Sequence, residues 1–266
     1  MPWPAPIPDR PRLLGIVNAT PDSFSDGGRH VGQAGVRHGL RLLSEGADAL
    51  DIGGESTRPG AAPVSVQEEL DRVLPVIEGF RAETDAPLSI DTRRAEVARA
   101  AVAAGADCWN DVSALRGEGS LDAAGDLGVP VVLMHMQGEP GTMQTAPSYG
   151  DVVEEVSAFL AERRDAARAA GVTGIVFDPG IGFGKTLAHN LALFRALPRF
   201  AALGPVMLGA SRKRLIAALD RDGPADGRLG GSLALALRGA AAGCAWLRVH
   251  DVAATRQAVS VWRAVR

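Results

Sequence analysis

The chain has 266 residues, of which 46% are hydrophobic and 22% are charged, and its formal net charge is -3. This balance is typical of a globular protein that buries a large core. It argues against an intrinsically disordered chain and against a polybasic surface for nucleic acid.

The cysteines and the N-terminal segment offer little specific chemistry. Cys108 and Cys244 form neither a C-x-x-C pair nor a cluster with metal-ligand spacing, so we interpret both as small buried hydrophobes. The start, MPWPAPIPDRPR, lacks the apolar stretch of a secretory signal, and no apolar run reaches the ~20 residues that span a bilayer. We therefore expect a cytoplasmic protein that binds neither membrane nor nucleic acid.

Short apolar or β-branched runs alternate with longer amphipathic stretches along the whole chain, which is typical of repeated βαβ units. Eight of these runs have the length of strands. They cover residues 13–17, 48–53, 87–90, 106–110, 129–134, 173–177, 205–208 and 245–249.

Several of the intervening stretches predict helices. The clearest is expected to start at Ser65, because Ser65 and Glu68 form a capping box ahead of an apolar stripe. Residues 152–160 predict a second amphipathic helix, and a third is expected to follow Asp251 as its N-cap. The Ala-rich stretch 232–244 favours a helix with little contrast between its faces.

The alternation predicts a single-domain α/β protein, a (β/α)₈ TIM barrel of residues 13–266 that follows an N-terminal extension of residues 1–12. Length permits this fold, because α/β barrels commonly occupy roughly 250 residues as one domain. An open doubly wound sheet is the structural alternative.

Polar side chains follow every predicted strand. One such residue is ordinary turn chemistry, but eight in succession indicate a pocket, because the carboxyl ends of barrel strands meet at one mouth. These polar groups are Asn18, the run 55–58, Asp91, Asn110 with Asp111, His135, Asp178, the run 211–213, and Arg248 with His250.

Two chemical sets can be separated among these residues. The first combines carboxylates, an amide and a cation, which suits a flat heterocycle with a 2-amino-4-oxo pyrimidine edge. It consists of Asp91, Asn110, Asp178 and Lys213. The second combines a neutral metal-ligand oxygen with donors for phosphate oxygens, which indicates a diphosphate site. It consists of Asn18, Thr57, Arg58, Arg248 and His250.

Several strings resemble the conserved loops of the dihydropteroate synthase family. LLGIVNATPDSFSDGG at 13–28 and IGGESTRPGA at 52–61 are similar to its first two loops. Shorter strings follow in family order: SIDT at 89–92, ND at 110–111, LMHMQG at 133–138, DPGIGFGK at 178–185, SRK at 211–213 and RVHD at 248–251. The resemblance covers essentially the whole chain after residue 12. Ala19 and Ala210 depart from the family pattern, but neither position contributes a functional group.

This resemblance implies a transferase of folate biosynthesis that condenses (7,8-dihydropterin-6-yl)methyl diphosphate with p-aminobenzoate to give 7,8-dihydropteroate and diphosphate. It implies that Asn18 ligates Mg²⁺, that Asp26, Arg58 and Lys213 serve catalysis, and that the chain forms a homodimer. The substrate-binding residues that it implies are Thr57, Asp91, Asn110, Asp178, Phe183, Gly209, Ser211, Lys213, Arg248 and His250. Sulfonamides, which resemble p-aminobenzoate in shape, are then expected to be inhibitors.

Other motifs favour plainer interpretations. The run 178–186 resembles a phosphate-binding P-loop, but Pro179 stands where that pattern needs glycine, so we expect Lys185 to be solvated. His135 favours a structural role, because no second histidine gives zinc-like spacing. Trp109 alternates with Asn110 along its strand and is expected to pack against the outer helices.

The implied chemistry requires no protein nucleophile, so catalysis would depend on positioning and electrostatics. Asp26 would stabilise a pterin cation, and the helix N-terminus after Ser211 would receive the aminobenzoate carboxylate. Two rival functions remain. One is a pterin-dependent methyltransferase barrel, which needs no diphosphate site, and the other is a non-catalytic pterin-binding homologue.

Overall fold

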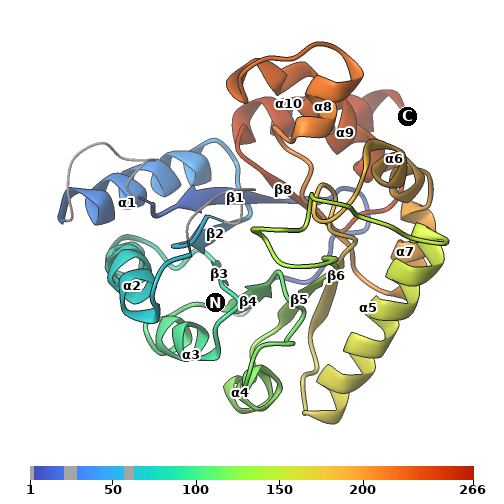
Figure 1. Cartoon of the computed structure of the whole chain (residues 1–266). Coiled ribbons are helices and arrows are strands. Elements are labelled where there is room, and N and C mark those ends of the chain that lie inside the picture. Colours follow the sequence, from blue (N-terminus) through green and yellow to red (C-terminus); the bar gives the residue numbers. More distant parts are fainter. Residues whose placement is uncertain (1–2, 21–28, 57–62) are drawn as a thin grey trace.

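Eight parallel strands close into a barrel whose helices lie outside it (Figure 1). The computed structural model describes residues 3–20, 29–56 and 63–266. The strands are β1 (Arg12–Asn18), β2 (Ala49–Gly53), β3 (Leu88–Asp91), β4 (Cys108–Asp111), β5 (Val131–Met134), β6 (Ile175–Asp178), β7 (Met207–Leu208) and β8 (Trp246–Val249). Their order is β6-β5-β4-β3-β2-β1-β8-β7, and a parallel bridge between Phe177 and Val206 joins the two ends of this order. The predicted TIM barrel is confirmed.

Helices follow the strands along the chain and cover the outside of the barrel (Figure 1). They are α1 (Arg29–Ser44), α2 (Val66–Glu83), α3 (Ala95–Ala103), α4 (Ser120–Leu127), α5 (Val152–Ala169), α6 (Leu187–Arg195), α7 (Leu197–Leu203), α8 (Arg214–Leu219), α9 (Leu229–Ala241) and α10 (Val252–Val265). A short 3₁₀ turn, Asp226–Arg228, precedes α9.

The ends of these helices test the sequence-based predictions. The capping box at the start of α2 is confirmed, because the Ser65 hydroxyl accepts from the Glu68 amide while the Glu68 carboxylate accepts from the Ser65 amide. The helix expected at 152–160 is α5, capped by Asp151. The capping role expected of Asp251 is wrong. Asp251 stands at the N-cap position of α10, but its carboxylate pairs with the Arg212 guanidinium.

Side chains alternate between the two faces of each strand, as the pleat requires. Outward-facing residues form the large core under the helices, and Trp109 belongs to it with no exposed surface. The Trp109 indole donates to the Thr92 carbonyl over 2.7 Å, so its polar edge is satisfied. The expected packing of Trp109 against the outer layer is thus confirmed.

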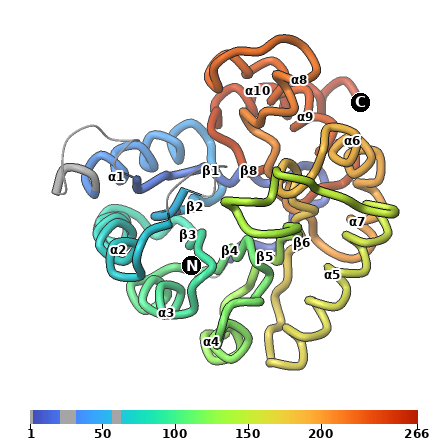
Figure 2. The backbone as a smooth tube through the Cα atoms, in the orientation of Figure 1, coloured from blue at the N-terminus to red at the C-terminus, as the bar shows by residue number. Residues whose placement is uncertain are grey.

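The lower interior of the barrel is apolar. A separate cluster fills it, formed by Leu14, Ala49, Cys108, Val132, Val176, Met207, Ala245 and Trp246. The Trp3 ring stacks on Trp246 with 4.7 Å between ring centroids, so the N-terminal segment packs against this cluster. Figure 2 shows the backbone alone, with the helices arranged around the strands.

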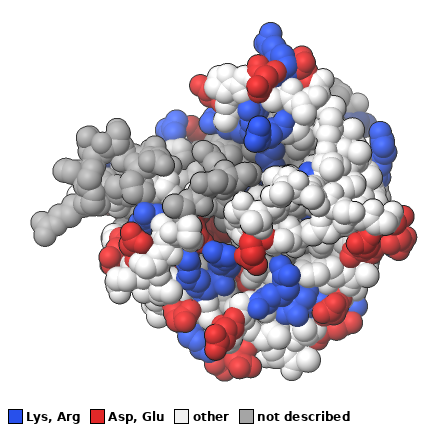
Figure 3. Space-filling view, viewed as in Figure 1, with Lys and Arg blue, Asp and Glu red and all other residues white. Residues whose placement is uncertain are grey.

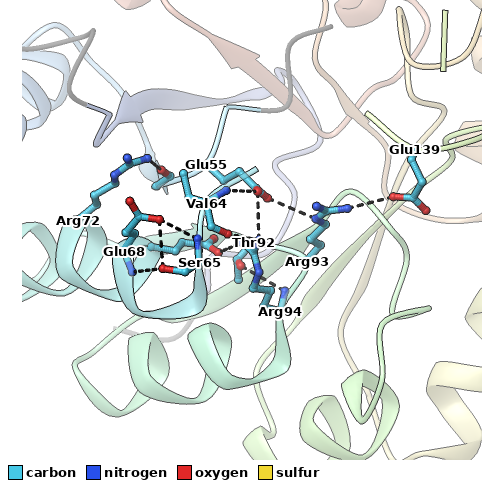
Figure 4. Close-up of polar contacts among 11 residues, drawn as sticks. Glu55, Val64, Ser65, Glu68, Arg72, Thr92, Arg93, Arg94 and Glu139 are labelled. Carbon is cyan, nitrogen blue, oxygen red and sulfur yellow. Dashed lines mark hydrogen bonds and ion pairs between the residues drawn. The ribbon is translucent and has the colours of Figure 1, made fainter. Parts of the chain in front are cut away.

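An ion-pair network holds the β2–α2 connection against the start of α3 (Figure 4). The Arg94 guanidinium donates to the Val64 carbonyl over 2.6 Å, to Glu55 over 3.1 Å, and to the fully buried Glu69. Glu55 and Val64 come from opposite ends of this connection, so Arg94 ties the two ends together. Losing Arg94 would leave the Glu69 carboxylate buried without its cation, which is costly.

The surface of the described residues is mixed in charge. In Figure 3 basic and acidic side chains are interspersed over the face that it displays. Among the described residues, no helix combines the length and the apolar character that crossing a membrane requires.

Trp3→Ala is expected to lower the melting temperature, because it removes an aromatic stack and opens the lower end of the barrel. For a half-buried tryptophan the loss is about 2 kcal/mol, or about 4 to 8 °C in a chain of this size. Thermal unfolding followed by circular dichroism measures the change. Val265→Ala, at a side chain that is 77% exposed, is the control and should change the melting temperature little. An unchanged midpoint in Trp3→Ala would show that the stack contributes nothing to stability.

Candidate active site

The carboxyl ends of the strands bring the first predicted set of residues together with Arg248, from the second set, at the mouth of the barrel. Asp91 ends β3, Asn110 lies in β4, Asp178 ends β6, and Arg248 lies in β8. Gly209 follows β7 and marks where they converge. A Cβ atom built at Gly209 would lie 3.5 Å from Asp178 Oδ2 and 3.9 Å from Arg248 Cδ. The glycine thus leaves space that a larger residue would fill.

Arg248 connects three strands through its guanidinium. Its Nε donates to Asp51 Oδ2 over 2.5 Å, and its Nη2 donates to Asp91 Oδ2 over 2.6 Å. The Asn110 amide donates to the same Asp51 oxygen over 3.1 Å. Burial raises the pKa of Asp91 to about 7, with the Asp51 charge adding to the rise and Arg248 opposing it.

Asp178 and Lys213 form the other half of this mouth. Asp178 Oδ1 accepts from the Gly180 amide over 2.7 Å, while Oδ2 faces the Gly209 position. Lys213 Nζ donates to the Ile181 carbonyl and lies 4.6 Å from the centroid of the Phe183 ring. Burial raises the pKa of Asp178 and lowers the pKa of Lys213 to about 8, and their mutual attraction opposes both shifts.

Lys185 is a correction to the sequence-based prediction. It was expected to be solvated, but only 3% of its surface is exposed. Its ammonium donates to the Gly180 carbonyl (3.0 Å), the Phe183 carbonyl (2.9 Å) and His135 Nδ1 (2.9 Å), so it fixes the loop after β6 from inside. The pKa of His135 falls to about 3 through burial and the nearby Lys185 charge, so the ring is neutral and can accept.

The loop after β6 also needs glycine at a close approach. Gly180 has a φ of +69°, and a Cβ there would lie 1.8 Å from the His135 carbonyl oxygen. The bonds to Lys185 and this contact press the loop against the end of β5. The interactions of His135 agree with the structural role expected for it.

A second group of predicted residues lies on the β1 and β8 side of the mouth. Asn18, at the end of β1, and His250, after β8, line one cavity of about 450 Å³. The cavity extends between α1 and α10, where Arg41 and Arg212 also line it. Asn18 and His250 thus share one space, as the proposed diphosphate set requires.

Ser211 is placed differently from the sequence-based expectation. Its hydroxyl contacts His250 Nδ1 over 3.1 Å and the His250 amide over 3.3 Å. The following helix, α8, begins only at Arg214, with Lys213 at its N-cap position. Ser211 therefore lies three residues before the helix and does not cap it.

Three predicted site residues cannot be placed. Asp26, Thr57 and Arg58 lie outside the described residues. Their assigned roles remain predictions. Arg248, which the sequence grouped with the diphosphate donors, has its guanidinium between the carboxylates of Asp51 and Asp91.

Asp51 is the site residue that sequence reasoning missed. It lies in the middle of β2 rather than after a strand, and it is fully buried. A carboxylate within the otherwise apolar run ALDIG is itself a signal, because an ionised group is rarely buried without a partner.

Known proteins with similar sequences and structures share one activity. The family model described as "Pterin binding enzyme" matches residues 14–250. The dihydropteroate synthase of Escherichia coli strain K12 is 46% identical over 255 residues, which is 94% of this chain and 90% of that protein.

Solved structures agree. Dihydropteroate synthase from Xanthomonas albilineans with 4-aminobenzoic acid superposes with a TM-score of 0.91 at 58% identity, covering 97% of this chain and 93% of that one. The enzyme of that organism has also been solved in complex with 7,8-dihydropteroate (TM-score 0.88, 55% identity, 97% and 95% coverage). The Yersinia pestis dihydropteroate synthase in a sulfonamide drug complex matches with a TM-score of 0.91 at 45% identity, covering 97% and 94%.

These matches span nearly the whole chain, well beyond what a shared barrel alone would give. The chain therefore belongs to the pterin-binding enzymes and, among them, to the dihydropteroate synthase family.

Proposed function

We propose that this chain is a dihydropteroate synthase, condensing (7,8-dihydropterin-6-yl)methyl diphosphate with p-aminobenzoate to give 7,8-dihydropteroate and diphosphate. The observation that carries the proposal is the convergence of Asp178, Lys213 and Arg248 around Gly209. Arg248 also binds Asp91, and Asn110 is connected to it through Asp51. The named ligands of the matching structures, 4-aminobenzoic acid and 7,8-dihydropteroate, support it.

The pterin ring is assigned to the mouth around Gly209. Asp178 Oδ2 faces this space and can accept two N–H groups from the 2-amino-pyrimidine edge, and Lys213 can donate to the ring carbonyl. The Phe183 ring beside Lys213 offers an apolar face to a flat ligand. Thr57, Asp91 and Asn110 complete the proposed pterin-binding residues.

The second substrate is assigned to the region of Ser211. The proposal places the aminobenzoate carboxylate near the Ser211 to Lys213 turn, where Lys213 supplies positive charge. The amine must then point toward the pterin methylene carbon. Asp26 and Arg58 would contribute from the loops to which they belong.

The diphosphate and Mg²⁺ are assigned to the cavity lined by Asn18 and His250. Among the described residues, no group of three or more His, Cys, Asp or Glu side chains could hold a metal ion. One amide oxygen from Asn18 nevertheless fits Mg²⁺, which commonly takes one or two protein ligands and completes its shell with water and substrate phosphates. When bound, Mg²⁺ would neutralise charge on the departing diphosphate.

The reaction breaks the bond between the pterin methylene carbon and the diphosphate oxygen, and the bonding electrons leave with diphosphate. The amine lone pair of aminobenzoate forms the new C–N bond, and the amine then loses one proton. Asp178 and Lys213 orient the ring, and carboxylates near it stabilise the positive charge that develops there.

Incubating the purified protein with the pterin diphosphate, p-aminobenzoate and Mg²⁺ tests the function directly. Dihydropteroate and diphosphate should form in equal amounts. A methyltransferase would release no diphosphate, and a non-catalytic homologue would bind the pterin without turnover.

We further propose that the protein acts in the cytoplasm as a homodimer and binds no nucleic acid or membrane.

Asp178→Asn should weaken pterin binding at least tenfold. It replaces an acceptor of charge-assisted bonds, worth about 1.5 to 3 kcal/mol, with an amide that points a donor at a substrate donor. Calorimetry with the pterin diphosphate measures the affinity. Asp122→Asn, at an exposed position on α4, is the matched control and should bind normally. Wild-type affinity in folded Asp178→Asn would remove Asp178 from the site.

Removing Mg²⁺ with a chelator should suppress turnover, and adding it back should restore it. In Asn18→Ala the Mg²⁺ concentration for half-maximal activity should rise about tenfold, since one ligand is lost at a cost of about 1.4 kcal/mol. Steady-state rates over a Mg²⁺ titration measure this. Full activity without metal, or the same Mg²⁺ requirement in the variant, contradicts the assignment.

Sulfonamides should compete with p-aminobenzoate, because the two share the para-substituted aniline shape. The apparent KM for p-aminobenzoate should rise with sulfonamide concentration while kcat stays constant. Initial rates at several aminobenzoate concentrations distinguish the patterns. Inhibition that saturating aminobenzoate does not relieve would place the drug elsewhere.

A further inference from the structure

Asp51 has a position that simple charge balance does not explain. It is fully buried in β2, and its neighbours in the strand, Leu50 and Ile52, point outward into the core. Arg248 already has a carboxylate partner at the mouth, Asp91, at 2.6 Å. A second buried carboxylate on the same guanidinium adds desolvation cost, so its contacts indicate a further role.

The contacts of Asp51 are concentrated on one oxygen. Oδ2 accepts from Arg248 Nε and from Asn110 Nδ2, two side chains on strands on either side of β2. Oδ1 is buried, and no hydrogen-bond partner for it is present among the described residues. Asp51 thus joins two predicted substrate-binding groups through a single oxygen.

We propose that Asp51 is a positioning residue of the pterin site, which orients Arg248 and Asn110. Its negative charge also opposes the ionisation of Asp91. The proposal rests on the function proposed above. Asp51 acts through these side chains and does not itself contact the reacting atoms. With Oδ2 bound from two sides, the Arg248 and Asn110 side chains each lose the freedom to rotate away before substrate arrives.

The charge of Asp51 also bears on Asp91. The charged groups that act on Asp91 are Arg248 from β8, Lys213 before α8, Asp51 from β2, Glu69 from α2 and Asp111 from β4. Arg248 and Lys213 favour the ionised form of Asp91, and the three acids oppose it. Removing the Asp51 charge takes away one repulsion and one competitor for Arg248, so the pKa of Asp91 should fall.

Asp51→Asn separates this role from a purely structural one. The substitution keeps the shape, and the new amide group can take the place of Oδ1, where no donor of the described residues opposes it. The dissociation constant for the pterin diphosphate should rise about tenfold, because the charge-assisted bonds to Arg248 and Asn110 weaken. The KM for p-aminobenzoate should change less than about twofold, since Asp51 touches no residue assigned to that substrate.

The pH dependence supplies the readout that a structural role would not move. Pterin affinity should decline as pH falls through the pKa of Asp91, about 7, because a protonated carboxyl accepts N–H groups poorly. In Asp51→Asn this decline in affinity on the acid side of the pH profile, the acid limb, should move to lower pH. Asp51→Glu, which retains the charge, should keep the limb near its wild-type position even if the longer side chain weakens binding.

Asp48→Asn is the matched control. Asp48 precedes the same strand at the opposite end of the barrel and pairs with Arg10 and Arg256. Burial opposes ionisation of Asp48, but its hydrogen bonds from Arg10, the Leu13 amide and Arg256 lower its pKa to about 2. Its substitution should lower the melting temperature while leaving the pterin affinity and the acid limb unchanged. The same pattern in Asp51→Asn, or failure of both Asp51 variants to fold, would assign Asp51 a structural role and overturn the proposal. Calorimetry on the wild-type protein comes first, because absence of pterin binding there would refute the proposed function itself.

Discussion

A guanidinium inside a closed barrel must be compensated there, and Arg248 meets this requirement with two carboxylates from different strands. An unpaired buried charge costs several kcal/mol, so the positions of Arg248, Asp51 and Asp91 depend on one another. Through Asp51 the same arrangement extends to Asn110. Four strands, β2, β3, β4 and β8, are thereby connected by side chains at the level where the substrate is expected.

The barrel interior is divided along its axis. Its lower part is apolar and is closed by the Trp3 and Trp246 stack, while the polar groups lie toward the carboxyl ends of the strands. Asp48 forms ion pairs with Arg10 and Arg256 at the lower end of the barrel, outside this cluster. Apolar packing in the lower part of the barrel stabilises the fold. The polar groups at the mouth can therefore stay buried for function, although their burial costs free energy. Substitutions at the two ends should therefore affect different properties.

Local patterns were enough to predict most of this fold. The eight strands lie within about two residues of their predicted positions, and the capping box at Ser65 forms as expected, because alternation and capping depend on neighbouring residues alone. The failures share a physical cause. Lys185 is buried because carbonyl groups and a histidine that follows another strand surround its ammonium. The Asp251 carboxylate pairs with Arg212 instead of accepting from an amide of its helix. Asp51 was missed because its partners are 59 and 197 residues away.

The charges at the mouth also explain why a ligand rich in N–H groups suits it. Among the described residues, the carboxylates of Asp51, Asp91 and Asp178 all act on the Arg248 guanidinium, while Lys213 and Lys185 act on Asp178. Burial raises the pKa of Asp91 to about 7, and the neighbouring Asp51 charge adds to this rise. A flat heterocycle that donates N–H groups to Asp91 or Asp178 would stabilise the ionised form of that carboxylate. The proposed recognition of a pterin edge thus depends on these buried carboxylates as much as on the shape of the mouth.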